Sequence, residues 1–306
     1  MKKALTALIV AFCVLLSLCV GASADESAEV YPYTFAFEEF WYEDAVALED
    51  TLPCKAALLM EADSGRVLFA QNETAKLPIA SVTKIMSTLL VMEAIDSGKI
   101  RLTDMVTVGE EAAHMGGSQV YLEVGEQMPV SDMLKALVVV SANDATVAMA
   151  EHLAGSQSSF VSQMNARAAE LGMSETHFAN CHGLNEEGHY SCARDVAIMT
   201  RELLKHPLIL EYTQIWMDTI RNGAFGLANT NKLIRFYNGA NGMKTGFTDT
   251  AKYCLSGTAK RDGMQLIAVI IGADTSEIRF ASAKKLLDFG FANYAVKTPE
   301  RIELEP

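Results

Sequence analysis

The chain has 306 residues, and half of them are hydrophobic, which is enough apolar material for one large domain or two small ones. Its 38 acidic and 25 basic side chains give a formal net charge of −13, which argues against a nucleic-acid-binding surface. An anionic substrate would need a local positive site against this acidic background.

The first 24 residues have the pattern of a secretory signal peptide. Lys2 and Lys3 precede an almost wholly apolar stretch, residues 4–20, and the small residues 22–24 follow it. This order predicts cleavage after residue 24 and export of the remaining chain. The alternative is an uncleaved membrane anchor, for which the apolar stretch is close to the lower length limit.

Four cysteines follow the predicted signal peptide: Cys54, Cys181, Cys192 and Cys254. Their spacing matches no zinc or redox motif, and nothing else in the sequence indicates a metal or an organic cofactor. Export permits disulfide bonds, but the sequence does not pair the cysteines, and four buried thiols are the alternative.

Residues 25–52 are acidic and aromatic without clear periodicity, and we expect an extended lead segment there. Two apolar runs in residues 56–72, separated by a turn at residues 63–65, predict a β-hairpin. An apolar helical run then opens near Ser81 and continues to about Asp96, with Gly98 as its stop.

The pattern from about 99 to 206 is mainly helical, and strands return from about 213. A second hairpin is predicted around residues 261–263, and a final helix over 276–294. This order predicts an α+β fold in which both chain ends contribute to one antiparallel sheet and a helical subdomain is inserted between them. We expect a domain over 53–295 and a tail over 296–306.

Ser81 and Lys84 are three residues apart at the start of a helix, so their side chains share one face. A nucleophilic serine needs a base within hydrogen-bond reach, and a lysine can serve if burial keeps it neutral. The alternative is a helix N-cap beside a surface lysine. A second pair, Ser282 and Lys285, lies inside the predicted final helix, where we expect only a solvated face.

Two further polar motifs follow in the chain. Ser141 and Asn143 lie between two apolar helices, where they form either a proton relay and amide ligand beside a cleft or a simple helix break. Lys244, Thr245 and Gly246 lie on a predicted strand. They would bind a carboxylate and allow close approach of a ligand, or else mark an edge strand with a protective lysine.

The three motifs in this order resemble those of the penicillin-recognising serine acyl transferases. Residues 176–197, which include His-Gly-Leu and Gly-His-Tyr-Ser, and residues 242–263 are similar to segments of one branch, the D-alanyl-D-alanine carboxypeptidases or low-molecular-mass penicillin-binding proteins. The resemblance covers about residues 53–293. It implies a β-lactamase/transpeptidase-like fold, with the antiparallel sheet flanked by helices from the N- and C-terminal regions.

The resemblance implies a catalytic role for four residues. Ser81 would attack the carbonyl between two D-alanines of a peptidoglycan pentapeptide stem, and Lys84 would take its proton. Ser141 would relay that proton to the leaving amine, and Asn143 would hold the substrate amide and place Lys84. Water would then release the shortened peptide, and β-lactams would acylate the same serine.

It also implies a substrate-binding set. Lys244 would lower the pKa of Lys84, and Thr245 would bind the terminal carboxylate next to Gly246. The backbone N–H groups of Ser81 and Phe247 would form the oxyanion hole.

Two residues outside the three motifs match positions of the same family. Arg279 matches an arginine that helps to hold the carboxylate, or is an exposed helix arginine. His182 matches a histidine beside the site, or is a structural histidine.

Three points stay open at this stage. A serine β-lactamase shares the motifs, but Glu186 and Glu187 lack the Glu-x-x-x-Asn setting of class A enzymes. A non-catalytic peptidoglycan or β-lactam sensor would keep the same pocket. Many relatives also carry a β-rich second domain and a C-terminal membrane anchor, neither of which precedes residue 306, so we expect membrane association only if the sequence is incomplete. The expected location is the cell-wall side of the bacterial cytoplasmic membrane.

Overall fold

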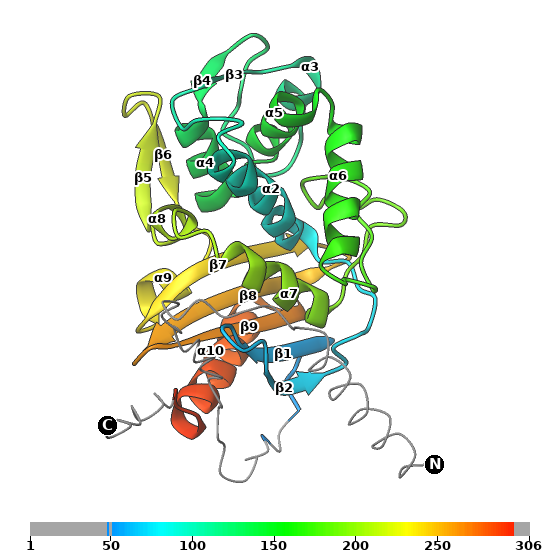
Figure 1. Cartoon of the computed structure of the whole chain (residues 1–306), viewed down its shortest axis with the longest axis vertical. Helices are drawn as coiled ribbons and strands as arrows, with labels where there is room; N and C mark the ends of the chain where they lie inside the picture. The colour runs from blue at the N-terminus through cyan, green and yellow to red at the C-terminus, as the bar shows by residue number, and fades with distance from the viewer. Residues whose placement is uncertain (1–47, 49–50, 297–306) are drawn as a thin grey trace, which may run out of the picture. The chain divides into compact units, whose positions relative to one another are not determined.

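The computed structural model describes residue 48 and residues 51–296, all within the unit Phe40–Lys297 of the two units into which the chain divides. The predicted signal peptide lies outside the described residues, as do nearly all of the predicted lead segment and tail. The elements are drawn in Figure 1.

A five-stranded antiparallel sheet with the order β2-β1-β9-β8-β7 forms the base of the fold. Its strands are β1 (Ala56–Glu61), β2 (Val67–Gln71), β7 (Ala240–Thr248), β8 (Lys252–Arg261) and β9 (Met264–Ala273). β1 pairs with β9 along its whole length, although the two strands come from opposite ends of the chain (Figure 1). Both predicted hairpins and the α+β class are confirmed.

Helices, short turns and two small strand pairs make up the rest of the described chain. The helices are η1 (Ala80–Thr83), α2 (Lys84–Asp96), α3 (Glu110–Ala113), α4 (Val130–Val139), α5 (Asn143–Ala154), α6 (Gln157–Glu170), α7 (Ala193–Leu203), α8 (Ile209–Thr213), α9 (Leu233–Phe236) and α10 (Ser276–Asn293). The small pairs are β3 (Met105–Thr107) with β4 (Gln127–Pro129), and β5 (Met217–Ile220) with β6 (Phe225–Ala228). The first pair interrupts the region predicted to be mainly helical.

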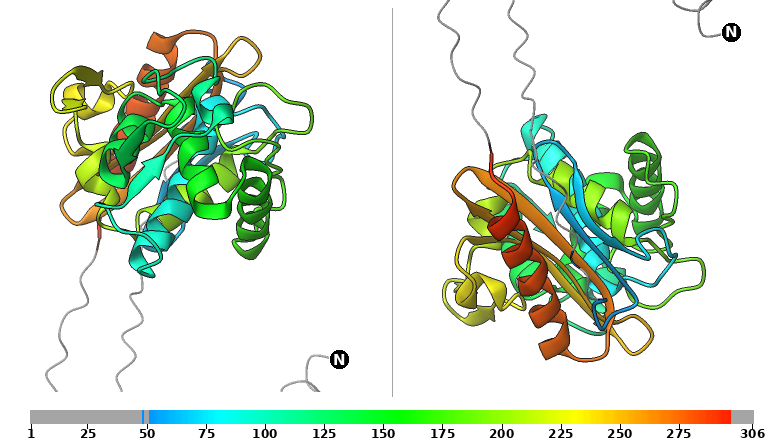
Figure 2. Two further views of the ribbon diagram at one scale, coloured as in Figure 1. Left: turned by 90° about the horizontal axis from the view of Figure 1, so that it is seen from above. Right: turned by 90° about the horizontal axis from the view of Figure 1, so that it is seen from below.

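Helices cover both faces of the sheet, so its central strands are buried on both sides. α10 crosses one face, as the view from below in Figure 2 shows, and α7 packs on the other. Side chains of β9 alternate between two apolar clusters: Leu266 packs in the cluster that includes residues of α10, and Ile267 packs in the cluster that includes residues of α2 and α7. This double burial explains why β9 is apolar throughout rather than at every second residue.

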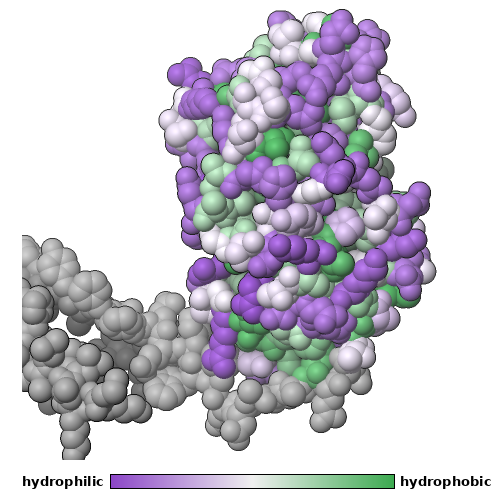
Figure 3. Space-filling model, turned by 90° about the vertical axis from the view of Figure 1, so that its right-hand side faces the viewer, coloured by the Kyte–Doolittle hydropathy of each residue, from purple (hydrophilic) through white to green (hydrophobic). Residues whose placement is uncertain are grey.

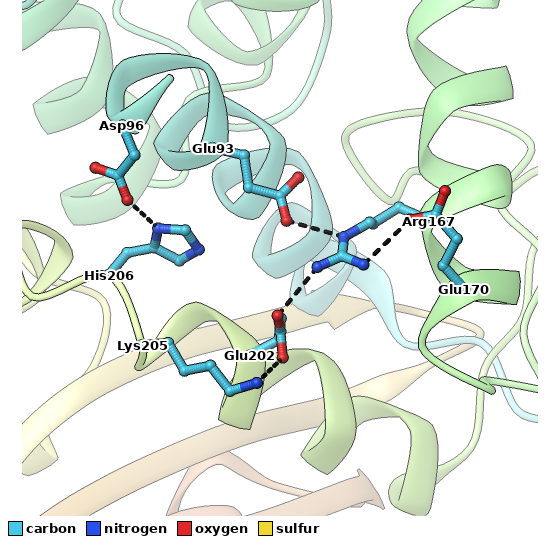
Figure 4. Close-up of polar contacts among 7 residues, drawn as sticks. All are labelled: Glu93, Asp96, Arg167, Glu170, Glu202, Lys205 and His206. Atoms are coloured by element: carbon cyan, nitrogen blue, oxygen red, sulfur yellow. Dashed lines mark hydrogen bonds and ion pairs between the residues drawn. The ribbon is translucent and has the colours of Figure 1, made fainter. Parts of the chain in front are cut away.

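A network of charged residues ties the helices α2, α6 and α7 together (Figure 4). Arg167 of α6 donates to Glu93 of α2 at 2.8 Å and to Glu202 of α7 at 3.0 Å. Its third carboxylate partner is Glu170, one turn further along α6. Because α2 begins at Lys84, this network also fixes the helix that carries the predicted base.

Hydrophilic residues are spread widely over the side of the molecule that carries α6, with apolar residues between them (Figure 3). Among residues 48 and 51–296, no helix combines the length and the apolar character that crossing a bilayer requires. The four cysteines are free thiols, and Cys54 is the only one of them that is not buried.

One surface prediction is wrong. Ser282 is buried within α10, and only Lys285 of the second Ser-x-x-Lys pair is exposed. The serine faces inward because α10 lies against the sheet along much of its length.

Candidate active site

Ser81 lies in the short 3₁₀ helix η1, directly before α2, and Lys84 is the first residue of α2. The Nζ atom of Lys84 is 3.0 Å from the Oγ atom of Ser81. Ser81 caps neither helix, because the N-cap positions are Ile79 and Thr83. The helix-cap interpretation is therefore wrong, while the predicted pairing of the two side chains is confirmed.

Lys84 is completely buried and has three hydrogen-bond partners. Besides Ser81, its amine donates to Asn143 Oδ1 at 2.6 Å and to the backbone carbonyl of His182 at 2.7 Å. Burial lowers the pKa of Lys84 to about 7, against a smaller opposing effect of Cys181 and Asp144. A large fraction of this amine is therefore neutral at physiological pH.

Ser141 and Asn143 lie at the junction of α4 and α5. Asn143 begins α5, and its Nδ2 donates to the carbonyl of Gly116 at 2.7 Å, which leaves Oδ1 facing Lys84. Ser141 has a left-handed backbone with φ of 64°. Its Oγ is buried and has no hydrogen-bond partner within the described part of the chain, an arrangement that a bound ligand could complete.

Lys244, Thr245 and Gly246 lie on β7, which is an edge strand of the sheet. Lys244 is nevertheless 4% exposed, so the interpretation as a protective surface lysine is wrong. Burial, repulsion from Lys84 and repulsion from Arg279 all lower the pKa of Lys244. Thr245 is hydrogen-bonded through its hydroxyl to Thr230 at 2.6 Å.

These segments enclose a cavity of about 290 Å³ in front of Ser81. Its lining consists of Ser81, Ser118, Ser141, Thr230, Thr245, Gly246, Phe247, Tyr253 and Arg279. Lys84 and Lys244 line a separate space of about 10 Å³ behind it. The cavity wall is thus rich in hydroxyl groups, and the two lysines lie deeper in the protein.

Two glycines allow other segments to lie against the Ser81 turn. A Cβ atom on Gly246 would come within 2.9 Å of Ser81 N, and one on Gly183 would come within 2.0 Å of the Ala80 carbonyl oxygen. Contacts this short leave no room for a side chain at either position. Both β7 and the loop after His182 therefore reach the nucleophile through backbone alone.

Arg279 lies near the start of α10 and is 6% exposed, so the exposed-arginine alternative is wrong. Its Nη1 donates to the carbonyls of Gly246 and Cys254, both at 3.2 Å. Its Nε is buried without a partner among the described residues. Burial lowers the pKa of this guanidinium to about 10, and the charge lies beside the cavity.

His182 is buried next to the site and contributes mainly through its backbone carbonyl. Its ring Nδ1 accepts from the N–H of Leu184 at 3.2 Å, and burial, with repulsion from Lys84, lowers the ring pKa to about 3. The ring is neutral, which agrees with a structural histidine placed beside the active site.

Four further residues shape the site although the sequence pattern did not single them out. Ser118 and Thr230 line the cavity. The buried carboxylate of Asp144 accepts from the backbone N–H groups of residues 120 and 122, which orders the segment that follows Ser118. Asn180 Oδ1 accepts from the N–H groups of residues 182 and 183. Only their proximity to the motifs could have suggested these residues.

The chain is similar to known proteins over most of its length. A family model described as D-alanyl-D-alanine carboxypeptidase matches residues 43–275. D-alanyl-D-alanine carboxypeptidase DacF of Bacillus subtilis is 49% identical over 265 residues, which are 85% of this chain and 68% of that protein. DacC of Escherichia coli is 38% identical over 290 residues, 92% of this chain and 71% of that protein.

Solved structures share the fold of this chain. Penicillin-binding protein 5 of Haemophilus influenzae aligns with a TM-score of 0.77 and 35% identity, covering 81% of this chain and 73% of that one. Penicillin-binding protein D2 of Listeria monocytogenes, in its ampicillin-bound form, aligns with a TM-score of 0.72 and 34% identity. The alignment covers 79% of this chain and 98% of that one. The fold, the match over residues 43–275 and the Ser81–Lys84 pair together place the chain in the D-alanyl-D-alanine carboxypeptidase family of serine peptidases.

Proposed function

We propose that the protein is a serine-type D-alanyl-D-alanine carboxypeptidase that removes the terminal D-alanine from peptidoglycan pentapeptide stems and is acylated by β-lactams. Family membership gives the reaction class and its place in cell-wall metabolism. The roles of individual residues rest on the geometry around Ser81.

The hydrogen bonds of Lys84 carry the proposal. Asn143 Oδ1 and the His182 carbonyl can only accept, and a neutral amine has two hydrogens for them. Its lone pair is then directed at the third partner, the Ser81 hydroxyl, 3.0 Å away. A pKa near 7 is close to the optimum for a general base at neutral pH.

Acylation would begin with transfer of the Ser81 proton and end with release of D-alanine. Lys84 takes the hydroxyl proton as Ser81 Oγ bonds to the carbonyl carbon of the penultimate D-alanine. The oxyanion accepts from the N–H groups of Ser81 and Phe247; losing one such donor typically costs about 10²–10³ in rate. Ser141 passes the proton to the leaving amine, the C–N bond breaks and D-alanine departs. Water then cleaves the ester and restores the hydroxyl.

The positive side of the cavity would bind the terminal carboxylate. Thr245 and Arg279 line it, and the amine of Lys244 donates to the Thr245 carbonyl at 2.9 Å. These groups supply the local positive site that an acidic protein needs for an anionic substrate.

We further propose that residues 53–295 form the catalytic domain, with a helical subdomain over about 99–206. Residues 1–24 would direct export to the cell-wall side of the membrane. A substrate in the cell wall supports this location, because the enzyme must leave the cytoplasm to reach it.

The test uses residues 25–306, a fluorescent penicillin and a peptide ending in D-alanyl-D-alanine. We expect a long-lived adduct on Ser81 and release of D-alanine, both lost in Ser81→Ala. Rapid penicillin turnover would indicate a β-lactamase, and an adduct without D-alanine release would indicate a sensor. Release of D-alanine by Ser81→Ala would contradict the assignment of the nucleophile.

A further inference from the structure

The peptide unit that joins Ala80 to Ser81 carries one of the two proposed oxyanion donors. It is a trans peptide, so its C=O group points away from its N–H group. The carbonyl oxygen accepts a hydrogen bond from the Thr83 hydroxyl at 2.8 Å. Whatever holds this carbonyl therefore also sets the direction of the Ser81 N–H.

His189 holds the hydroxyl of Thr83 in turn. The two side chains meet at 2.7 Å through Nε2 and Oγ1, and both are buried. The other ring nitrogen, Nδ1, accepts from the backbone N–H of Ala179 at 3.1 Å. An accepting Nδ1 requires the proton on Nε2, so His189 donates to Thr83, and the Thr83 hydroxyl has its hydrogen free for Ala80.

These contacts form a chain with one direction, from Ala179 N–H through His189 and Thr83 to the Ala80 carbonyl. Burial and repulsion from His177 lower the pKa of His189 to about 4, so the ring stays neutral at physiological pH. Hydrogen bonds in series polarise one another. The last one draws electron density toward the Ala80 oxygen and makes the N–H on the same peptide unit a stronger donor.

The backbone at this point needs such support. Ala80 has φ of 47°, a left-handed conformation that is unfavourable for a non-glycine residue. Residues in such conformations persist where the surroundings over-determine them, and they cluster at functional sites. Here Gly183 packs on the Ala80 carbonyl, and Thr83 bonds to it.

We infer that Thr83 and His189 are positioning residues of the oxyanion hole: they fix and polarise the Ala80–Ser81 peptide so that its N–H faces the substrate carbonyl. Neither residue lines the cavity. The inference rests on the proposed function, because it assigns supporting groups to the donor proposed there.

The primary test compares Thr83→Val, which keeps the side-chain shape, with Thr83→Ser, which keeps the hydroxyl. We expect Thr83→Val to lower the second-order rate of acylation by a fluorescent penicillin about 10-fold to 100-fold, less than loss of a whole donor. Thr83→Ser should stay within about threefold of the wild type, since the hydroxyl remains. Thermal unfolding shows whether each variant is folded at the assay temperature.

Two measurements separate this role from a merely structural one. A peptide boronic acid forms a tetrahedral adduct with a serine, and its affinity for Thr83→Val should fall by the same factor as kcat/KM. In the Ser81→Ala background, adding Thr83→Val should leave the affinity for the D-alanyl-D-alanine peptide unchanged. In addition, the double variant Thr83→Val with His189→Phe should lose little more activity than Thr83→Val alone, because the two residues act in series.

The inference is overturned if Thr83→Val is acylated at the wild-type rate, if Thr83→Ser loses as much as Thr83→Val, or if boronic-acid affinity is unchanged while kcat/KM falls. In each case the wild-type enzyme still releases D-alanine, so the proposed function stands. A wild-type protein that neither forms the adduct nor releases D-alanine would instead overturn the proposed function, and this inference with it.

Discussion

Gly183→Ala is expected to impair catalysis by displacing the peptide that carries the Ser81 N–H. A Cβ at this position would lie 2.0 Å from the Ala80 carbonyl oxygen and 2.9 Å from Ser81 N. Real Cβ atoms do not approach heavy atoms closer than 3.0 Å, so the peptide that carries the Ser81 N–H must move by about 1 Å. A misplacement of about 1 Å at a reacting group can cost about 10²-fold in rate. We therefore expect kcat/KM for D-alanine release to fall about 100-fold.

Gly188→Ala is the matched control, because it lies in the same segment and also has a positive φ, 79° compared with 92° for Gly183. A Cβ there would meet only the His177 ring, at 3.8 Å, an ordinary contact. Gly188→Ala should lose about 1–2 kcal/mol of unfolding free energy from the left-handed alanine. Gly183→Ala should lose more than this, because its Cβ also displaces backbone, and only Gly183→Ala loses acylation by a fluorescent penicillin. Equal activity of the two variants would refute the reasoning from the contact with Ala80.

Three further predictions concern the base, the carboxylate site and the helix network. Because Lys84 acts as a base only when neutral, kcat/KM should rise as pH increases through about 7, and a profile that is flat from pH 5 to 9 would contradict this. Thr245→Val removes a hydroxyl from the cavity wall and should raise KM for the peptide about 10-fold, as expected for one hydrogen bond to a charged group, whereas Thr245→Ser should not. Arg167→Met should cost about 1–2 kcal/mol in urea unfolding, because it removes the guanidinium that pairs with the partly buried Glu93 and one of the two cations that pair with Glu202. Arg194→Met, at a more exposed pair, should cost less than 1 kcal/mol.

The fold could be predicted from the sequence where periodicity and turn residues agree. The two hairpins and the helix that ends at Asp96 follow from such local signals. The β3–β4 pair could not be predicted in this way, because strands of three residues are too short to show a period. Ser282 was misplaced because a small hydroxyl residue is tolerated on either face of a helix, and only tertiary packing shows that this face of α10 is buried.

The site could be predicted where chemistry is carried by unusual residue combinations. Lys84 is within hydrogen-bond distance of both Ser81 and Asn143, as the motifs implied. Asn180 and Asp144 were missed because a single polar residue in a loop or in the first turn of a helix has no pattern of its own. Their function here is to accept hydrogen bonds from backbone N–H groups, which is visible only after folding.

The main cause of the low pKa of Lys84 is the core itself rather than a neighbouring cation. Its side chain is fully buried at the start of α2, and burial is the largest cause of the shift. Repulsion between the two buried lysines appears in the lowered pKa of Lys244, which repulsion from Arg279 lowers further. A bound carboxylate beside Thr245 would offset that repulsion and favour the charged form of Lys244. Substrate binding would thus raise the pKa of Lys244, and the added positive charge next to Lys84 would favour the neutral form of that base.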